Sequence, residues 1–367
     1  MKKLIIALIT LIVLLSGCAK KTTVIPLIIY NEADPYMAEF AQYIIDKAPS
    51  EYDVVSFDSQ NSQLIQNGFI EDAFKDKSKV VIINPVDRLG AYTIIEKAKS
   101  ENIPIIFINR EPLKEDLYLW KDAFYVGAPA AHSAVLQSEI IMDLFGIPLN
   151  LNELDRNNDN IIQLIILKGE QGHQDAETRT DVVIQELEDH GYSLEILSIE
   201  ICDWKTVLAY DIMNELLPLY KDQLELVISN NDAMAIGAIQ AMIEHEMFID
   251  VDENGFIDHE TDIWIPVVGI DGIADAVELI KSGYLYGTVL NDSESMAEAI
   301  IELTTAIING EDINTISFEI IDNKYIWVDY QKYILEEEWD FLEILFFFGE
   351  IYKLIIRYYI VRVYFYW

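Results

Sequence analysis

Short apolar runs alternate with longer segments in which apolar residues recur every third or fourth position along most of this chain. Short β-branched runs are typical of strands buried on both faces, and the longer period is typical of amphipathic helices. The first series of predicted strands is residues 24–30, 52–57, 80–84 and 104–109, and its predicted helices are residues 35–48, 62–75 and 91–102. Because strands and helices alternate, we expect a parallel, doubly wound sheet.

The same alternation returns in a second series. Its predicted strands are residues 161–167, 194–201, 224–229, 265–270 and 285–290, and its predicted helices are residues 131–145, 175–190, 204–217, 233–244, 274–282 and 293–309. Two series of similar size predict an α/β fold with two doubly wound parallel-sheet lobes that face each other across a cleft. Clefts of this kind bind small ligands by hinge closure.

Residues 155–179 join three features without a gap. An oxygen-rich loop precedes the strand 161–167, and a glycine-bounded turn then delivers His173, Asp175 and Arg179 to the start of a helix. The oxygens of the loop have the alternating spacing of calcium loops. Polar groups that converge at the carboxyl end of a parallel strand mark the usual ligand site of such sheets. This stretch therefore predicts a metal at the entrance of one strand and a ligand at its exit.

Composition narrows the class of ligand. The chain has 367 residues, with 25 Lys and Arg against 63 Asp and Glu and a formal net charge of −38. Phosphate backbones are bound by clustered cations, so this balance argues against a nucleic-acid surface. At 51% hydrophobic residues the chain has ample material for two cores.

The N-terminus has the pattern of an export signal. Lys2 and Lys3 precede the apolar run 4–15, and Cys18 follows directly after Leu-Ser-Gly. This arrangement resembles a bacterial lipoprotein signal in which Cys18 is acylated and becomes the mature N-terminus; the alternative is an uncleaved anchor helix. The remaining Cys202 then has no partner, so no structural disulfide is expected.

Polar and aromatic residues follow the predicted strands as a set. They are Asp34, Tyr36, Asn84, His173, Asp175, Arg179, Trp204, Asn231, Asp271 and Asn291. Carboxylates accept hydrogen bonds from hydroxyls, whereas Arg and Asn amides donate to them, so the set suits a neutral polyol. The flat rings of Tyr36 and Trp204 suit the apolar C–H faces of a pyranose.

Each of these residues also has a simpler reading. Asp34 and Asp175 each precede or open a helix and alone are more often N-caps. Trp204 alone is more often a core residue, and His173 alone is more often a hydrogen-bonded loop residue. The three asparagines, taken singly, are ordinary turn residues. Only their joint placement at strand ends favours a ligand site.

The chain resembles the bacterial D-galactose/D-glucose-binding proteins of the periplasmic sugar-binding superfamily. The resemblance covers about residues 24–330 and rests on DSQN at 58–61, IIEKAKSENIPIIFINREP at 94–112, ILKGEQGHQDAETR at 166–179, ISNNDAMAIGA at 228–238 and GTVLND at 287–292. It implies two α/β lobes joined by three hinge strands and one hexose bound between them. It also implies a receptor that delivers sugar to an ABC permease, with a chemoreceptor as a second partner, rather than an enzyme.

The resemblance places the family's sugar contacts on the set described above. Asp34 matches the acceptor near the epimeric O4, and Asn84, His173, Asp175, Arg179, Asn231, Asp271 and Asn291 match the other polar contacts. Tyr36 stands where the family usually has Phe, so it and Trp204 are expected to sandwich the ring. The added phenol is expected to reach a hydroxyl or a water.

The oxygen-rich loop matches the family's structural calcium site. Its implied ligands are Asp155, Asn157, Asp159, the Ile161 carbonyl, Gln163 and the distant Glu225, which supplies the closing carboxylate. The alternative is a surface turn rich in Asx residues. The acidic insert at 250–262 has similar spacing, and for it a second, weaker calcium site and a solvated acidic loop both stay open.

The resemblance also divides the chain. It assigns residues 1–18 to the signal peptide, 19–23 to a tether, 24–110 with 292–327 to the N-terminal lobe, and 111–291 with 328–340 to the C-terminal lobe. Residues 341–367 depart from the family. For this apolar tail a membrane-surface segment, a partner-binding strand and non-native read-through sequence are the alternatives, and we favour the last.

Two other classes of protein use the same fold. A sugar-converting enzyme would use Asp34, His173 and Asp175 as acid and base, but aromatic walls with balanced donors and acceptors describe binding better. A sugar-responsive repressor would need a DNA-binding helix pair, whereas this chain begins with an export signal. The sequence therefore favours a lipid-anchored, extracytoplasmic sugar receptor, periplasmic in a Gram-negative cell.

Overall fold

The computed structural model describes residues 22–335 of the chain. Cys18 and the tail 341–367 lie outside these residues, as do the expectations that concern them. Within the described range, Cys202 is a buried free thiol.

The first lobe is built on a six-stranded sheet in the order β13-β5-β4-β3-β1-β2. Its strands are β1 (Thr23–Ile29), β2 (Tyr52–Asp58), β3 (Val81–Ile83), β4 (Ile105–Ile108), β5 (Ala123–Gly127) and β13 (Tyr325–Trp327). All neighbouring strands pair in parallel. The central strands are almost entirely apolar because both of their faces are covered.

Helices cover both faces of this sheet. They are α2 (Pro35–Asp46), α3 (Gln63–Lys75), α4 (Ala91–Glu101), α5 (Lys114–Leu117) and α11 (Ser293–Asn309), with the 3-10 turns η1 (Arg88–Gly90) and η2 (Ile313–Thr315). One core joins α3, α4 and α5 to one sheet face, and another joins α2 and α11 to the other. Helix α11 returns from the far end of the sequence to pack on α2.

The second lobe repeats the design with the strand order β14-β12-β11-β10-β8-β9. Its strands are β8 (Ile161–Lys168), β9 (Ser193–Ile201), β10 (Leu226–Ser229), β11 (Val267–Asp271), β12 (Gly287–Leu290) and β14 (Gln331–Ile334). The ladders from β9 to β12 are parallel. The strand 161–167 predicted at the centre of the sequence is thus an inner strand of this sheet.

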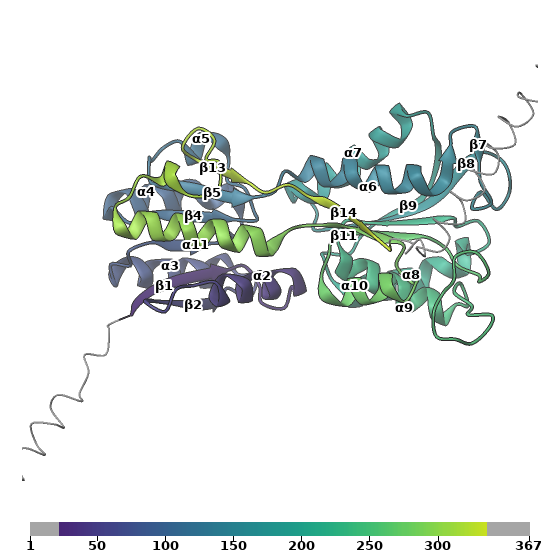
Figure 1. Cartoon of the computed structure of the whole chain (residues 1–367), viewed down its shortest axis with the longest axis horizontal. Helices are drawn as coiled ribbons and strands as arrows, with labels where there is room; N and C mark the ends of the chain where they lie inside the picture. Colours follow the sequence, from purple (N-terminus) through teal and green to yellow (C-terminus); the bar gives the residue numbers. More distant parts are fainter. Residues whose placement is uncertain (1–21, 336–367) are drawn as a thin grey trace, which may run out of the picture. The chain divides into compact units, whose positions relative to one another are not determined.

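Helices again cover both sheet faces, with α6 and α7 on one side and α8, α9 and α10 on the other (Figure 1). These helices are α6 (Ala130–Phe145), α7 (Gln174–Asp189), α8 (Thr206–Tyr220), α9 (Asp232–Glu244) and α10 (Ala274–Lys281). A small antiparallel hairpin, β6 (Gly146–Ile147) with β7 (Asn150–Leu151), precedes β8. The fold is therefore the predicted pair of doubly wound parallel-sheet lobes.

The chain passes between the sheets three times, and the first passage differs from the expected boundary. The predicted N-terminal lobe ended at residue 110, but β5 pairs with β4, and α5 packs against the same sheet. Residues 111–127 therefore belong to the first lobe, because β5 supplies the partner that β13 requires. The other passages lie between β12 and α11 and between β13 and β14.

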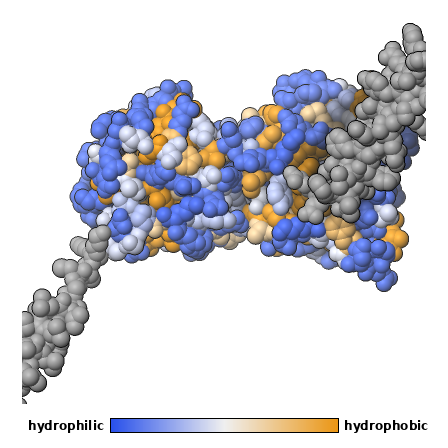
Figure 2. Space-filling model, in the orientation of Figure 1, coloured by the Kyte–Doolittle hydropathy of each residue, from blue (hydrophilic) through white to orange (hydrophobic). Residues whose placement is uncertain are grey.

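The surface is largely hydrophilic on the face shown in Figure 2, with hydrophobic residues in scattered patches. Isolated apolar residues on a surface are normal and need no partner. None of the helices between residues 22 and 335 combines the length and the apolar character that a membrane span requires.

Candidate functional site

A cavity of about 40 Å³ lies where residues from both sheets converge. Its lining residues are Tyr30, Asp34, Tyr36, Asn109, Arg110, His173, Asp175, Arg179, Trp204, Asn231, Asp271 and Asn291. Every residue predicted to contact the sugar, except Asn84, is among them. Most follow the carboxyl end of a strand or open the next helix, which is where parallel sheets place ligands.

Asn84 does not line the cavity, which corrects one sequence-based assignment. Its side chain is fully buried, accepts a hydrogen bond from the Tyr30 N–H at 3.2 Å and donates to the Ile108 carbonyl at 3.0 Å. Both ends of the amide are therefore used to tie β3 to β1 and β4. Asn109, which ends the next predicted strand, takes the place in the cavity.

Sequence reasoning also missed Tyr30 and Arg110. Arg110 is 5% exposed, and its guanidinium carbon lies 3.8 Å from the centroid of the Tyr30 ring. The Tyr30 hydroxyl in turn donates to the Asp34 carboxylate. Both residues directly follow or end predicted strands, so the same strand-end rule would have found them.

Asp34 serves both as a helix cap and as a cavity residue. Its carboxylate accepts from the backbone N–H groups of Tyr36 at 3.0 Å and Met37 at 3.3 Å, which caps α2. Burial raises the pKa of Asp34 above its usual value. The capping role and the ligand role are therefore compatible, because a carboxylate has lone pairs to spare.

Trp204 forms one wall of the cavity from a strained turn. It was expected to open a helix, but α8 begins at Thr206, and Asp203 and Trp204 have left-handed φ values of 49° and 65°. This conformation is unusual for a bulky residue and is typical of functional sites. The indole packs against Gly169, where a Cβ atom would lie 2.2 Å from the ring. The backbone is thus shaped to hold this ring.

A buried arginine lies at the centre of the C-terminal half of the site. Arg179 donates from Nη1 to the Asn230 carbonyl at 2.7 Å and from Nη2 to the Tyr330 hydroxyl at 3.0 Å. The Asp271 carboxylate lies 4.0 Å from Nη1. Burial raises the pKa of Asp271 well above its usual value, and Arg179 opposes that shift.

Asp232 fixes the backbone that carries Asp271. Its carboxylate accepts from the N–H groups of Gly272 at 2.6 Å and Ile273 at 3.2 Å and from the Thr288 hydroxyl at 2.7 Å. Burial raises the pKa of Asp232 to about 6. Asp271 itself has a φ of 131°, a backbone conformation that residues with side chains rarely adopt. The hydrogen bonds to Asp232 therefore hold this loop in place.

Three polar atoms in the cavity wall have no hydrogen-bond partner within residues 22–335. They are the Tyr36 hydroxyl, Nε of Arg179 and Oδ1 of Asn291, all of which are buried. Because a buried polar atom without a partner costs roughly 1–3 kcal/mol, each of these atoms requires a partner from a ligand or water. Two of the three can donate and one accepts, which is the complement of a molecule rich in hydroxyls.

His173 presents a donor to the cavity. Its Nδ1 accepts the backbone N–H of Asp175 at 3.1 Å, which makes His173, and not Asp175, the cap of α7. The neutral ring must then carry its proton on Nε2. Burial lowers the pKa of His173 to about 4, and Arg110 and Arg179 add to that effect.

Ligand affinity is therefore expected to stay constant between about pH 8 and pH 5 and to fall as the pH approaches 4. The folded-state pKa is depressed, so the contribution of neutral His173 to stability is complete above pH 6.5 and is lost as the pH falls through about 4. Calorimetric affinities across this range measure the effect. The variant His173→Asn, which retains a capping group, should lose the acid step; the same step in the variant would assign it to the carboxylates instead.

The predicted calcium loop has a favourable but incomplete set of oxygens. Glu225 accepts from the N–H groups of Arg156 at 2.6 Å and Gln163 at 3.2 Å, which brings it to the loop as expected. Oδ1 and Oδ2 of Asp155 accept from the backbone at Asp159 and Asn160. The Gln163 side chain is 2% exposed and its Oε1 has no partner within the described residues.

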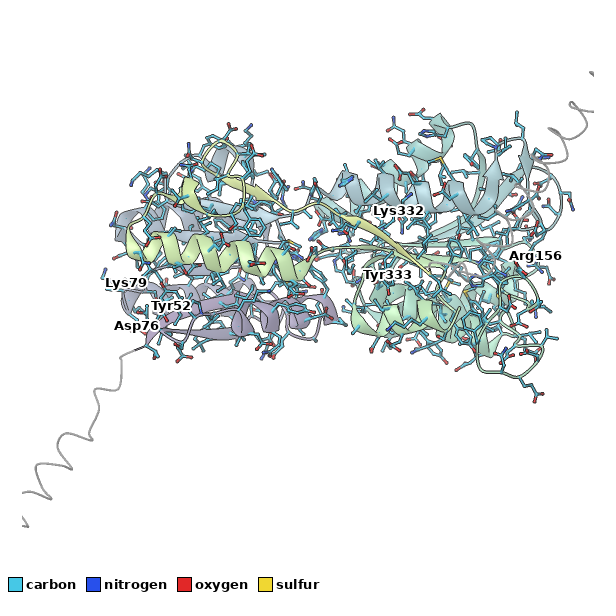
Figure 3. All side chains as sticks on the ribbon, viewed as in Figure 1. Tyr52, Asp76, Lys79, Arg156, Lys332 and Tyr333 are labelled. Carbon is cyan, nitrogen blue, oxygen red and sulfur yellow. The ribbon has the colours of Figure 1, made fainter. Side chains whose placement is uncertain are left out.

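No group of three or more His, Cys, Asp or Glu side chains between residues 22 and 335 is arranged to hold a metal ion on its own. A calcium ion here would therefore depend on the amide oxygens of Asn157 and Gln163 and on the Ile161 carbonyl as well. The buried, unpaired Gln163 oxygen fits that requirement. Figure 3 labels Arg156, which lies in this loop at one end of the second lobe.

The acidic insert at 250–262 forms a compact turn. Asp250 accepts from the N–H groups of Asn254 and Gly255, and Asp262 accepts from Val251 and Asp258. These backbone bonds lower the pKa of Asp250. The Asp250 and Asp262 carboxylates thus hold the backbone of the insert in place.

Comparison with known proteins gives consistent matches. Residues 25–312 match the periplasmic binding protein domain family. The chain is 37% identical over 255 residues to the D-galactose/methyl-galactoside binding periplasmic protein of Haemophilus influenzae. The match covers 69% of this chain and 71% of the relative. It is 24% identical over 318 residues to the ribose import binding protein of Salmonella typhimurium, which covers 85% of this chain and 95% of that one.

Solved structures share the fold. A solute-binding protein of Actinobacillus succinogenes with bound D-allose superimposes with a TM-score of 0.69 at 19% identity, covering 85% of this chain and 98% of that one. A solute-binding protein of Bacillus halodurans with bound myo-inositol gives a TM-score of 0.66 at 24% identity, covering 87% and 96%. At these identities the likeness concerns the fold alone.

Proposed function

Because the chain belongs to the periplasmic binding protein family, we propose that it captures D-galactose or D-glucose outside the cytoplasm and delivers the sugar to an ABC importer. Sugar binding, the role of transporter substrate-binding protein and the extracytoplasmic location follow from the family. The choice of hexose is our proposal. It is supported by the 37% identity to a relative named for D-galactose and methyl-galactoside binding.

The observation that carries this proposal is the set of unpaired polar atoms in the cavity wall. The Tyr36 hydroxyl, Arg179 Nε and Asn291 Oδ1 face a cavity that Trp204 closes on one side. A pyranose supplies hydroxyls for the polar atoms and a C–H face for the indole. A phosphorylated or carboxylated sugar would lie beside Asp34, Asp175 and Asp271. These acidic side chains disfavour the negative charge of such a ligand.

The two lobes already touch beside the cavity. Arg110 Nη2 from the first lobe lies 3.3 Å from the Glu170 carboxylate of the second, and Gln174 Nε2 lies 3.4 Å from Glu111. A ligand held by both lobes strengthens such contacts, so sugar binding shifts the population toward the closed form. We propose that the permease recognises this closed form, and that a chemoreceptor also recognises it.

A thermal-shift panel tests the sugar preference. D-galactose and D-glucose should each raise the melting temperature by several degrees at saturating concentration, because a ligand that binds only the folded state stabilises it. Ribose, D-allose and myo-inositol serve as comparison ligands. One relative is a ribose import binding protein, and two structural neighbours hold D-allose and myo-inositol. A larger shift with one of these three would replace the proposed hexoses by that sugar.

The relatives and the fold are those of binding proteins and not of enzymes. Asp34 fits this assignment, because its carboxylate caps α2 through the N–H groups of Tyr36 and Met37. Sugar incubated with the protein should therefore be recovered unchanged.

We propose in addition that Cys18 carries a lipid that anchors the mature protein to the membrane. The charged start, the short apolar run and the Leu-Ser-Gly-Cys sequence support this. Mass spectrometry of the protein from membranes should find a diacylated or triacylated N-terminal peptide. Replacing Cys18 with Ser should release the protein from the membrane fraction.

Calcium is proposed as a structural ion at Asp155, Asn157, Asp159, Ile161, Gln163 and Glu225. Chelation should lower the melting temperature by about 5–10 °C, since saturating ligand contributes a few kcal/mol to folding. Sugar affinity should change little, because these residues do not line the cavity. Glu225→Gln should melt at the chelated temperature with or without calcium. If chelation left the melting temperature unchanged, a structural calcium ion at this loop would be excluded.

A further inference from the structure

Tyr330 lies in the segment that links the two sheets. It follows β13 of the first sheet and directly precedes β14 of the second. Val328, two residues earlier, donates its N–H to the Gly127 carbonyl at 2.9 Å, at the end of β5. Tyr330 is 4% exposed but does not line the cavity. Its ring packs in the apolar core of the second lobe, near His132 of α6.

The hydroxyl of Tyr330 holds the buried arginine of the site. It accepts from Nη2 of Arg179 at 3.0 Å across a sequence separation of 151 residues. Burial raises the pKa of Tyr330 to about 12, so the hydroxyl is neutral at any physiological pH. The other guanidinium nitrogen, Nη1, is fixed by the Asn230 carbonyl at 2.7 Å.

These two bonds fix the orientation of the guanidinium. Nη1 is tied to the junction of β10 and α9 and Nη2 to the linking segment, and Nε is the guanidinium nitrogen without a partner within residues 22–335. Both anchors lie in the second lobe, because the Tyr330 ring packs in the core of that lobe and Asn230 follows β10.

We propose that Tyr330 is a positioning residue that strengthens sugar binding by orienting Arg179. The inference rests on the proposed sugar-binding function. The hydroxyl fixes Arg179 so that the unpaired Nε faces the sugar. Tyr330 thus strengthens the site without lining the cavity itself.

The variant Tyr330→Phe removes only the hydroxyl and keeps the ring that packs near His132, at 6.4 Å between centroids. Tyr333→Phe is the matched control, because Tyr333 lies three residues on, in β14 (Figure 3), and does not line the cavity. Stopped-flow fluorescence with D-galactose gives the association and dissociation rates of both variants.

Tyr330→Phe should raise the dissociation rate about tenfold with little change in the association rate, because a hydrogen bond to a charged group is lost from the closed complex. Tyr333→Phe should match the wild type. Equal dissociation rates in all three proteins would overturn the proposal.

A second measurement separates positioning from general stability. If Tyr330 acts through Arg179, then Tyr330→Phe should cost less than about twofold in an Arg179→Lys background, where Lys lacks the second nitrogen of the fork. A tenfold cost in both backgrounds would show that Tyr330 acts by another route. Failure of the wild type to bind any sugar would instead refute the proposed function itself.

Discussion

Replacement of Trp204 by alanine is expected to weaken hexose binding about seventyfold. Covering a pyranose face removes roughly 100 Å² of the indole from water, and at about 25 cal/mol per Å² this contributes about 2.5 kcal/mol to binding. The strained backbone at Asp203 and Trp204 and the close approach of Gly169 are consistent with a ring held for such a contact. Isothermal titration with D-galactose measures the loss.

The control for this variant is Trp264→Ala. Trp264 belongs to the same lobe and stacks on His259 at 3.8 Å between ring centroids, but it does not line the cavity. It should lower the melting temperature and leave the dissociation constant near the wild-type value. If Trp204→Ala bound galactose as tightly as this control, the stacking role would be wrong.

Arg179→Met should reduce affinity at least a hundredfold. The substitution removes the unpaired Nε donor and also the cation that lies 4.0 Å from Asp271. Hydrogen bonds from charged groups contribute roughly 1.5–3 kcal/mol each, and the loss of one partner leaves the other buried charge exposed to its full desolvation cost. Titration at high protein concentration measures the weakened binding.

Arg179→Met should also destabilise the protein without ligand, because Asp271 is 6% exposed and loses its nearest cation. Arg179→Lys keeps the charge but not the fork, so it should retain most of the stability and lose roughly tenfold in affinity. An Arg179→Met protein that binds galactose with near wild-type affinity would exclude Arg179 from the sugar contacts.

The fold could be predicted where strands are continuous β-branched runs. Strands such as β1 and β8 are recognisable because both of their faces are covered, which requires apolar residues throughout. By contrast, α5 is four residues long and carries no full amphipathic period, and β5 is bounded by alanine and glycine. Missing this pair moved the expected lobe boundary, since a boundary depends on which sheet the last strand joins.

The residues of the candidate site could be predicted where they follow the carboxyl ends of parallel strands. Parallel strands present their carboxyl ends at one edge, so polar residues there converge whatever the details of packing. The rule does not say which of two asparagines turns into the cavity. Asn84 is engaged by Tyr30 and Ile108, whereas Asn109 is left to face the ligand. The sequence alone also cannot reveal a contact such as that of Tyr330 with Arg179, because it depends on how the last passage between the sheets is placed.

A calorimetric titration tests whether the protein binds the proposed hexoses. The purified protein, free of bound sugar, is titrated with D-galactose and then with D-glucose. We expect one sugar to bind per chain, with a dissociation constant in the micromolar range or tighter for at least one of the two hexoses. The absence of binding heat for both hexoses, together with saturable binding of a charged or non-sugar ligand in the same cavity, would contradict it.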